Sequence, residues 1–172
     1  MRAILLSVKP EWVAKILNGE KTIEIRKTMP KCEFPIDVYI YCTNDKNKYL
    51  YWDWYDPPFV THEWFVSNNP RYFIWEHKKH KNGKVVCKFT LNKVEEIICR
   101  PIGGEWESYT KTLGYSEISQ ASCLRNREIV HYLKGNNGYA WYISDLEILD
   151  KPKELSDFGL KKAPQSWCYV EN

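Results

Sequence analysis

The sequence has no apolar run long enough to cross a membrane. The stretch AILLSV near the start ends at Lys9 and falls far short of the ~20 residues that span a bilayer. It follows Met1 and Arg2 directly and leads into no small-residue cleavage site, so we expect no signal peptide. These absences predict a protein of the cytoplasm that has no membrane partner.

Cysteine motifs are also lacking, although the chain has six cysteines. None of them forms a C-x-x-C pair, and four sit inside strand-like apolar stretches, which favours free thiols over a disulfide framework. His77 and His80 with Cys87 resemble part of a ligand set, but no fourth ligand has suitable spacing. Neighbouring lysines would also repel a cation. We therefore expect no metal and no other cofactor.

Net charge is small, at +3, and by itself indicates no nucleic-acid partner. Its distribution is more informative, because residues 1–31 hold seven Lys/Arg against three Glu. The stretch HKKHKNGK (77–84) holds four lysines and no acid. Two basic clusters in a nearly balanced chain are compatible with a face that binds a polyanion.

The chain has 172 residues, 44% of them hydrophobic, which is enough to bury a hydrophobic core. This length predicts a single domain, 1–172. One amphipathic helix is predicted at 10–18, where Pro10 fits the first helical position and Asn18-Gly19 ends the helix. A second is predicted at 126–134. Alternating or β-branched runs predict strands at 3–8, 22–26, 36–43, 84–98, 139–149 and 166–170. This pattern predicts an α+β fold, a small β-barrel with flanking helices.

An aromatic-rich insertion interrupts this pattern at about 49–83. Residues 49–75 hold eleven of the 26 aromatic residues, and Pro57-Pro58 excludes a central strand there. Three interpretations remain open. The insertion is a satellite core on a barrel flank, a stacking platform for exposed bases, or a docking patch for a protein partner of unknown identity.

The charged stretch GEKTIEIRK contains Gly19, Lys21, Glu24 and Arg26 in the pattern G-x-K-x-x-E-x-R. With SVKPEW upstream, and GYAWYISDLEILDKPKELSDF and APQSWCYV downstream, the sequence resembles the ASCH domain family of the PUA-like superfamily. The resemblance covers roughly 3–48 and 84–170. It implies a small β-barrel associated with RNA, with a charged cleft beside the first helix.

Alternation in TIEIR places Ile23 and Ile25 toward the core, and Glu24 and Arg26 on the opposite face. Lys21 precedes Glu24 by three residues, an odd number, so in a continuous strand its side chain would point to the opposite face. It joins Glu24 and Arg26 only if it lies in the turn before the strand. The resemblance implies a site for RNA or a modified nucleobase or nucleoside, and we expect Lys9, Lys21, Glu24 and Arg26 to line it. The alternative is a solvated pair of Glu24 and Arg26 on the surface, worth ~0–1 kcal/mol.

Catalysis is a separate question. One branch that this sequence resembles hydrolyses acylated cytidines with a Lys–Thr–Glu set in which the threonine is the nucleophile. Lys21 is retained here, but Glu24 occupies the place of the nucleophile, so that set is broken. The enzymatic alternative is a hydrolase of the same cleft, either a nucleoside amidohydrolase that uses a water activated by Glu24 or a ribonuclease that uses Lys21, Glu24 and Arg26. The catalytic residues are unknown.

Overall fold

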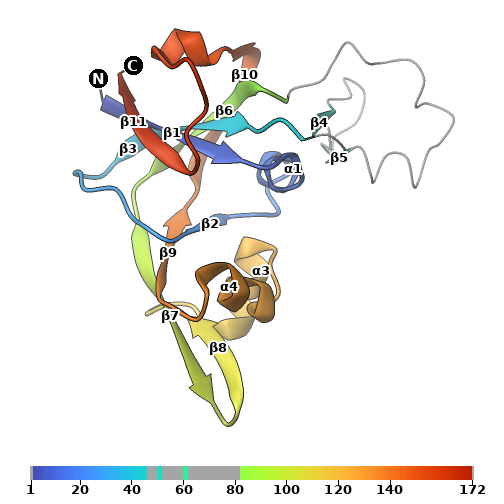
Figure 1. Cartoon of the computed structure of the whole chain (residues 1–172), viewed down its shortest axis with the longest axis vertical. Coiled ribbons are helices and arrows are strands. Elements are labelled where there is room, and N and C mark those ends of the chain that lie inside the picture. The colour runs from blue at the N-terminus through green and yellow to red at the C-terminus, as the bar shows by residue number, and fades with distance from the viewer. Residues whose placement is uncertain (1, 46–49, 52–59, 62–81, 172) are drawn as a thin grey trace, which may run out of the picture. The chain divides into compact units, whose positions relative to one another are not determined.

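The computed structural model describes residues 2–45, 50–51, 60–61 and 82–171 (Figure 1). Most of the aromatic insertion, His77, His80 and Lys78, Lys79 and Lys81 of the basic loop lie outside these residues. Only the short strands β4 (Leu50–Tyr51) and β5 (Val60–Thr61), which pair with each other, are described between 46 and 81. The three interpretations of the insertion therefore stay predictions.

The described chain divides into two compact units. The first unit comprises residues 1–19, 36–89 and 145–172. Its five-stranded sheet has the order β10-β6-β3-β1-β11. The sheet is mixed, because β1 pairs with β3 in parallel and with β11 antiparallel. The strands are β1 (Arg2–Val8), β3 (Ile36–Cys42), β6 (Lys84–Leu91), β10 (Ser144–Lys153) and β11 (Trp167–Glu171).

Helix α1 (Pro10–Leu17) and the 3₁₀ helix η2 (Leu155–Phe158) complete the first unit. Pro10 is at the first helical position, and the buried residues of α1 include Val13, Ile16 and Leu17. Phe158 of η2 packs against Tyr39 with ring centroids 4.9 Å apart. The predicted first helix is thus confirmed, with its amphipathic stripe.

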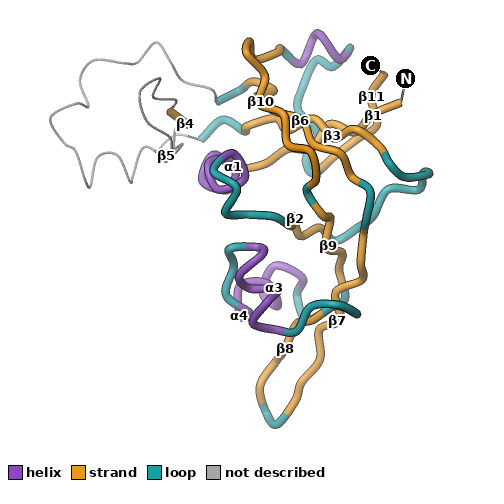
Figure 2. The backbone as a smooth tube through the Cα atoms, turned by 180° about the vertical axis from the view of Figure 1, so that it is seen from behind, coloured by secondary structure: helices purple, strands orange, loops and turns teal. Residues whose placement is uncertain are grey.

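The second unit comprises residues 20–35 and 90–144. Its four-stranded sheet has the order β2-β9-β7-β8, and all three neighbouring pairs of strands are antiparallel. The strands are β2 (Ile23–Arg26), β7 (Val94–Ile102), β8 (Glu105–Tyr109) and β9 (Gly138–Tyr142). Figure 2 shows β7 and β8 as a long hairpin. Gly103 and Gly104 form its two-residue turn with positive φ at both positions, as such turns require.

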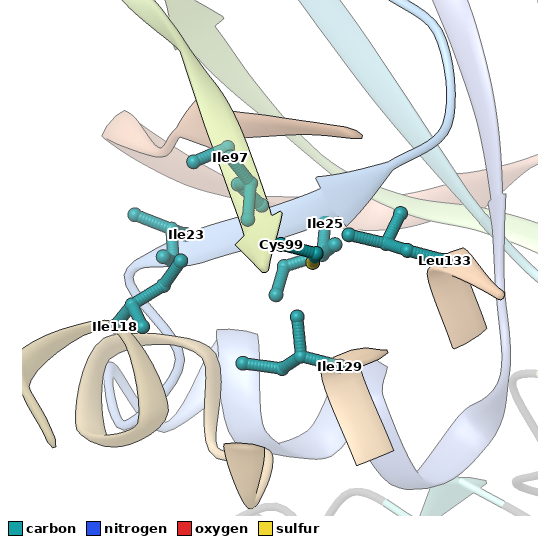
Figure 3. Close-up of a cluster of buried hydrophobic side chains, with 8 residues drawn as sticks. Ile23, Ile25, Ile97, Cys99, Ile118, Ile129 and Leu133 are labelled. Atoms are coloured by element: carbon teal, nitrogen blue, oxygen red, sulfur yellow. The ribbon is translucent and has the colours of Figure 1, made fainter. Parts of the chain in front are cut away.

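Helices α3 (Tyr115–Ser122) and α4 (Asn126–Leu133) pack on one face of this sheet. In Figure 3, Ile118, Ile129 and Leu133 of the helices point toward side chains of the strands. The alternation in β2 explains which strand residues meet them, because Ile23 and Ile25 face the helices. The two helices therefore fix which face of β2 carries its charged residues.

The predicted α+β class is confirmed, and two of the predicted strands are corrected. The run at 84–98 is two strands in different sheets, because exposed Asn92 and Lys93 interrupt it. The run at 139–149 likewise breaks at Ile143, beside Asp145 with φ +48. Both breaks lie close to the boundaries between the two units. The single-domain organisation stays a prediction.

All six cysteines are free, as predicted. Cys42, Cys87 and Cys99 are buried, and the other three are half-buried. Burial raises the pKa of Cys42 to about 12, so its thiol stays protonated and inert near neutral pH. No helix within the described parts of the chain has the length and apolar character to span a bilayer.

Candidate functional site

The charged residues of the motif lie at the start of the second unit. Gly19 has φ +73, a left-handed conformation that favours glycine, and the chain then reaches β2 through residues 20–22. Lys21 therefore precedes the strand, which is the condition under which it can join Glu24 and Arg26. We call Lys21, Glu24 and Arg26 the charged cluster.

The three side chains of the charged cluster contact one another and are buried. One carboxylate oxygen of Glu24 lies 3.0 Å from Nη2 of Arg26, and the other lies 3.2 Å from Nζ of Lys21. Lys21 is 2% exposed, and Glu24 and Arg26 are each 7% exposed. The alternative of a solvated surface pair is therefore wrong. Two cations against one carboxylate leave the cluster with a formal charge of +1.

Lys21 also holds the end of α3. Its ammonium group donates a hydrogen bond of 2.9 Å to the carbonyl of Ser122, the last residue of that helix. The neighbouring amide of Thr22 donates to the carbonyl of Ala121 at 2.9 Å. The last carbonyls of a helix lack partners within the helix and carry partial negative charge, so a cation there is favourable. This anchoring fixes the position of the ammonium group beside Glu24.

One carboxylate oxygen of Glu24 is paired with a cation but accepts no hydrogen bond from the described residues. This oxygen, Oε2, is buried and lies 3.2 Å from the ammonium of Lys21. Trp141 of β9 is opposite Glu24 in the register and is fully buried. Residues that face each other across antiparallel strands have side chains on the same face, so the indole flanks the carboxylate. Glu24 can thus accept a hydrogen bond from a donor on a bound group.

Tyr132 of α4 extends the charged cluster toward solvent. Burial raises the pKa of its hydroxyl, the positive charge of Arg26 and a hydrogen bond from it lower that pKa, and the negative charge of Glu24 raises it. The ammonium of Lys27 lies 5.1 Å from the centre of the Tyr132 ring. Because Tyr132 is 38% exposed, it connects the buried charges to the protein surface.

The structure brings together three of the four predicted site residues. Lys9 is exposed, belongs to the first unit and precedes α1 as its N-cap residue, so its part in binding stays a prediction. The cleft predicted beside residues 10–18 involves both units and also stays a prediction. Sequence reasoning missed Ser122, Tyr132 and Trp141. They are ~100 residues from the motif in the chain, and no local pattern marks them.

This arrangement favours recognition of a planar polar group. A guanidinium group can donate to a carbonyl or phosphate oxygen, while a carboxylate accepts from an amino or imino group. Side chains of these two types read the edges of nucleobases in many complexes. Among the described residues, no group of three or more His, Cys, Asp or Glu is placed to hold a metal ion.

The family model of the ASCH domain matches residues 6–152, well over half of the chain. The chain belongs to the ASCH domain family. The ASCH domain is a PUA-like module, a class linked in general to RNA binding. No curated protein matches the chain significantly.

Solved structures support the same fold. The crystal structure of ASCH from Zymomonas mobilis matches with a TM-score of 0.59 and 16% identity, over 98% of this chain and 87% of that one. Two single-substitution variants of that protein match at 15% identity, again over 98% of this chain. Their TM-scores are 0.59 and 0.60, with 88% and 90% of their own chains covered. At these identities the likeness shows the fold alone, and it confirms the predicted ASCH-like α+β fold.

Proposed function

We propose that the charged cluster binds a nucleobase, carried either by single-stranded RNA or by a free modified nucleoside. The observation that carries the proposal is the buried carboxylate of Glu24, whose Oε2 lies 3.2 Å from the Lys21 ammonium but accepts no hydrogen bond from the described residues. A buried acceptor without a hydrogen bond costs ~1–3 kcal/mol, which a ligand donor would recover. The excess positive charge favours a ligand that also carries a phosphate.

The three residues have different roles in this proposal. Glu24 accepts a hydrogen bond from the base edge, and Arg26 donates to a carbonyl or phosphate oxygen. Lys21, held by the carbonyl of Ser122, supplies positive charge and keeps Glu24 in place. Tyr132 lies where the ligand would enter, because it is the half-exposed neighbour of Arg26. We also propose a cytoplasmic location, which the six free cysteines support.

The test compares binding of single-stranded RNA with binding of free nucleosides. Binding of a fluorescein-labelled single-stranded RNA is measured by anisotropy for the wild type, Arg26→Lys and Glu24→Gln. Arg26→Lys keeps the charge but loses the planar donor pair, so we expect weaker binding by about tenfold or more. Competition by unlabelled N4-acetylcytidine or cytidine distinguishes a nucleoside site from an RNA site. Unchanged affinity for every probe in both variants, with melting curves showing that both are folded, would overturn the proposal.

A further inference from the structure

A second concave site lies on the β7–β8 hairpin, away from the residues of the charged cluster but in the same unit. It is a pocket of about 320 Å³. We call it the hairpin pocket. Its lining comes from the two strands, the following loop and the first residue of α3, and includes Arg100, Ile102, Tyr109, Lys111 and Tyr115. Its volume is at the lower end of the range for small-ligand sites.

The hairpin pocket combines exposed apolar side chains with cations. Tyr115 is 54% exposed and Ile102 is 39% exposed, and both are among the few large apolar side chains that the described residues leave in solvent. The guanidinium carbon of Arg100 lies 5.0 Å from the centre of the Tyr109 ring, within the range of a cation–π contact. Arg100 and Lys111 outnumber the one lining carboxylate, Glu107, so the lining has an excess of positive charge.

Within the described part of the chain, Arg100 forms no ion pair with Glu107, the acidic residue opposite it on β8. The guanidinium group lies over the Tyr109 ring instead. A guanidinium plane, like an aromatic ring, is a surface on which an unstacked base can stack.

Glu95 holds the loop that lines one side of the hairpin pocket through hydrogen bonds. Its Oε2 accepts hydrogen bonds from the hydroxyls of Thr110 at 2.6 Å, Thr112 at 2.7 Å and Tyr142 at 3.0 Å. Thr110 Oγ1 in turn accepts from the amide of Leu113 at 3.0 Å. The loop that carries Lys111 is therefore fixed before any ligand binds, and a preformed site loses less entropy on binding.

Alternation along β7 places this site on the same sheet face as the charged cluster. Trp141 is the register partner of both Glu24 and Val94. Arg100 follows Val94 by six residues, an even number, so it projects from the same face about 20 Å further along the strand. On this face Glu96 and Arg100 of β7 are exposed, whereas Trp141 of β9 is buried.

We propose that the hairpin pocket is a second RNA-contact site, which holds one unstacked nucleotide of a single strand. Its base stacks against Tyr115 and the Arg100–Tyr109 pair, and its phosphate lies near Lys111. This inference rests on the proposed function, since it extends the same RNA strand from the charged cluster.

The experiment measures the affinity of a labelled single-stranded RNA for Tyr115→Ala and Arg26→Ala in parallel. Loss of one stacked base corresponds to about a 5- to 150-fold weaker affinity, which we expect for Tyr115→Ala. Tyr115→Phe keeps the ring and should bind as the wild type does. Trp106→Ala is the matched control. It removes an exposed aromatic of the same hairpin that does not line the pocket, and should leave the affinity unchanged.

The outcomes separate the two proposals. Weaker binding in both alanine variants supports both sites. Weaker binding in Arg26→Ala alone overturns the proposal that the hairpin pocket binds RNA. Weaker binding in Tyr115→Ala alone supports that proposal and overturns the one for the charged cluster. As an independent readout, RNA carrying 4-thiouridine should crosslink under ultraviolet light to peptides that contain Tyr109 or Tyr115. Absence of such crosslinks, with normal affinity in Tyr115→Ala, would refute the second site.

Discussion

Replacing Glu24 by alanine tests whether the charged cluster is as buried as the structure shows. The substitution leaves the side chains of Lys21 and Arg26, 2% and 9% exposed, without their shared counter-charge. Removing one partner of a buried ion pair typically costs ~3–5 kcal/mol, because a charge is left buried and uncompensated. Glu24→Gln keeps the shape but not the charge, and we expect most of the same loss.

The assay is equilibrium unfolding in urea, with the free energy of unfolding compared between variants. Glu147→Ala is the matched control. Glu147 also forms an ion pair, with Lys88 at 3.0 Å, but the side chain of Glu147 is 59% exposed. Exposed ion pairs contribute ~0–1 kcal/mol, so the control should change stability little. If Glu24→Ala also cost under ~1 kcal/mol, the charged cluster would be solvated in solution and the reasoning would fail.

Three further predictions address the framework and the chemistry of the second unit. Gly138→Ala should destabilise the protein by ~1–3 kcal/mol in urea unfolding, because an added Cβ would lie only 2.4 Å from Leu133 and 3.0 Å from the Arg26 carbonyl; wild-type stability would contradict this close packing. Burial raises the pKa of Glu95, but three hydroxyls and Lys93 lower it to about 2, so its stabilisation is present above pH 4.5 and is lost as the pH falls toward 2. Acid unfolding of Glu95→Gln should lack that contribution, and identical acid profiles would refute the assignment. The protein should not hydrolyse N4-acetylcytidine, because Glu24 occupies the place of the threonine nucleophile; turnover that disappears in Lys21→Ala would show this inference to be wrong.

Local patterns predicted much of the fold because they act over a few residues. The alternation in TIEIR predicted which face of β2 holds its charges, and Asn18-Gly19 predicted the end of the first helix. Whether Lys21 joins Glu24 and Arg26 was left as a condition, which the position of Lys21 before β2 meets. Helix α3 was not predicted, because Ile118 is its one buried large apolar residue and its sequence has little periodicity. The changes of sheet near 90 and 144 were missed as well. The polar pairs Asn92-Lys93 and Ser144-Asp145 were read as part of longer strands, and which sheet each half joins depends on distant strands.

The remainder of the site depends on contacts between distant parts of the chain. Ser122 accepts the Lys21 hydrogen bond through its backbone carbonyl, so its side-chain identity gave no signal. Tyr132 lies on α4 next to the buried Leu133, where a half-exposed tyrosine looks like ordinary helix surface. Only the tertiary packing of α4 brings it to Arg26.

The most direct test of the account is RNA affinity across a salt series, compared between Arg26→Ala and a triple alanine variant of Lys78, Lys79 and Lys81. The loop lysines lie outside the described residues, and we expect them to add only long-range attraction that disappears at high salt. Arg26→Ala should weaken binding more at every salt concentration. It should also reduce the slope of log affinity against log salt by ~0.7, as expected for one lost phosphate contact to a single strand. Equal losses in the two variants, or a larger loss in the triple variant, would show that the basic loop and not the charged cluster is the binding surface.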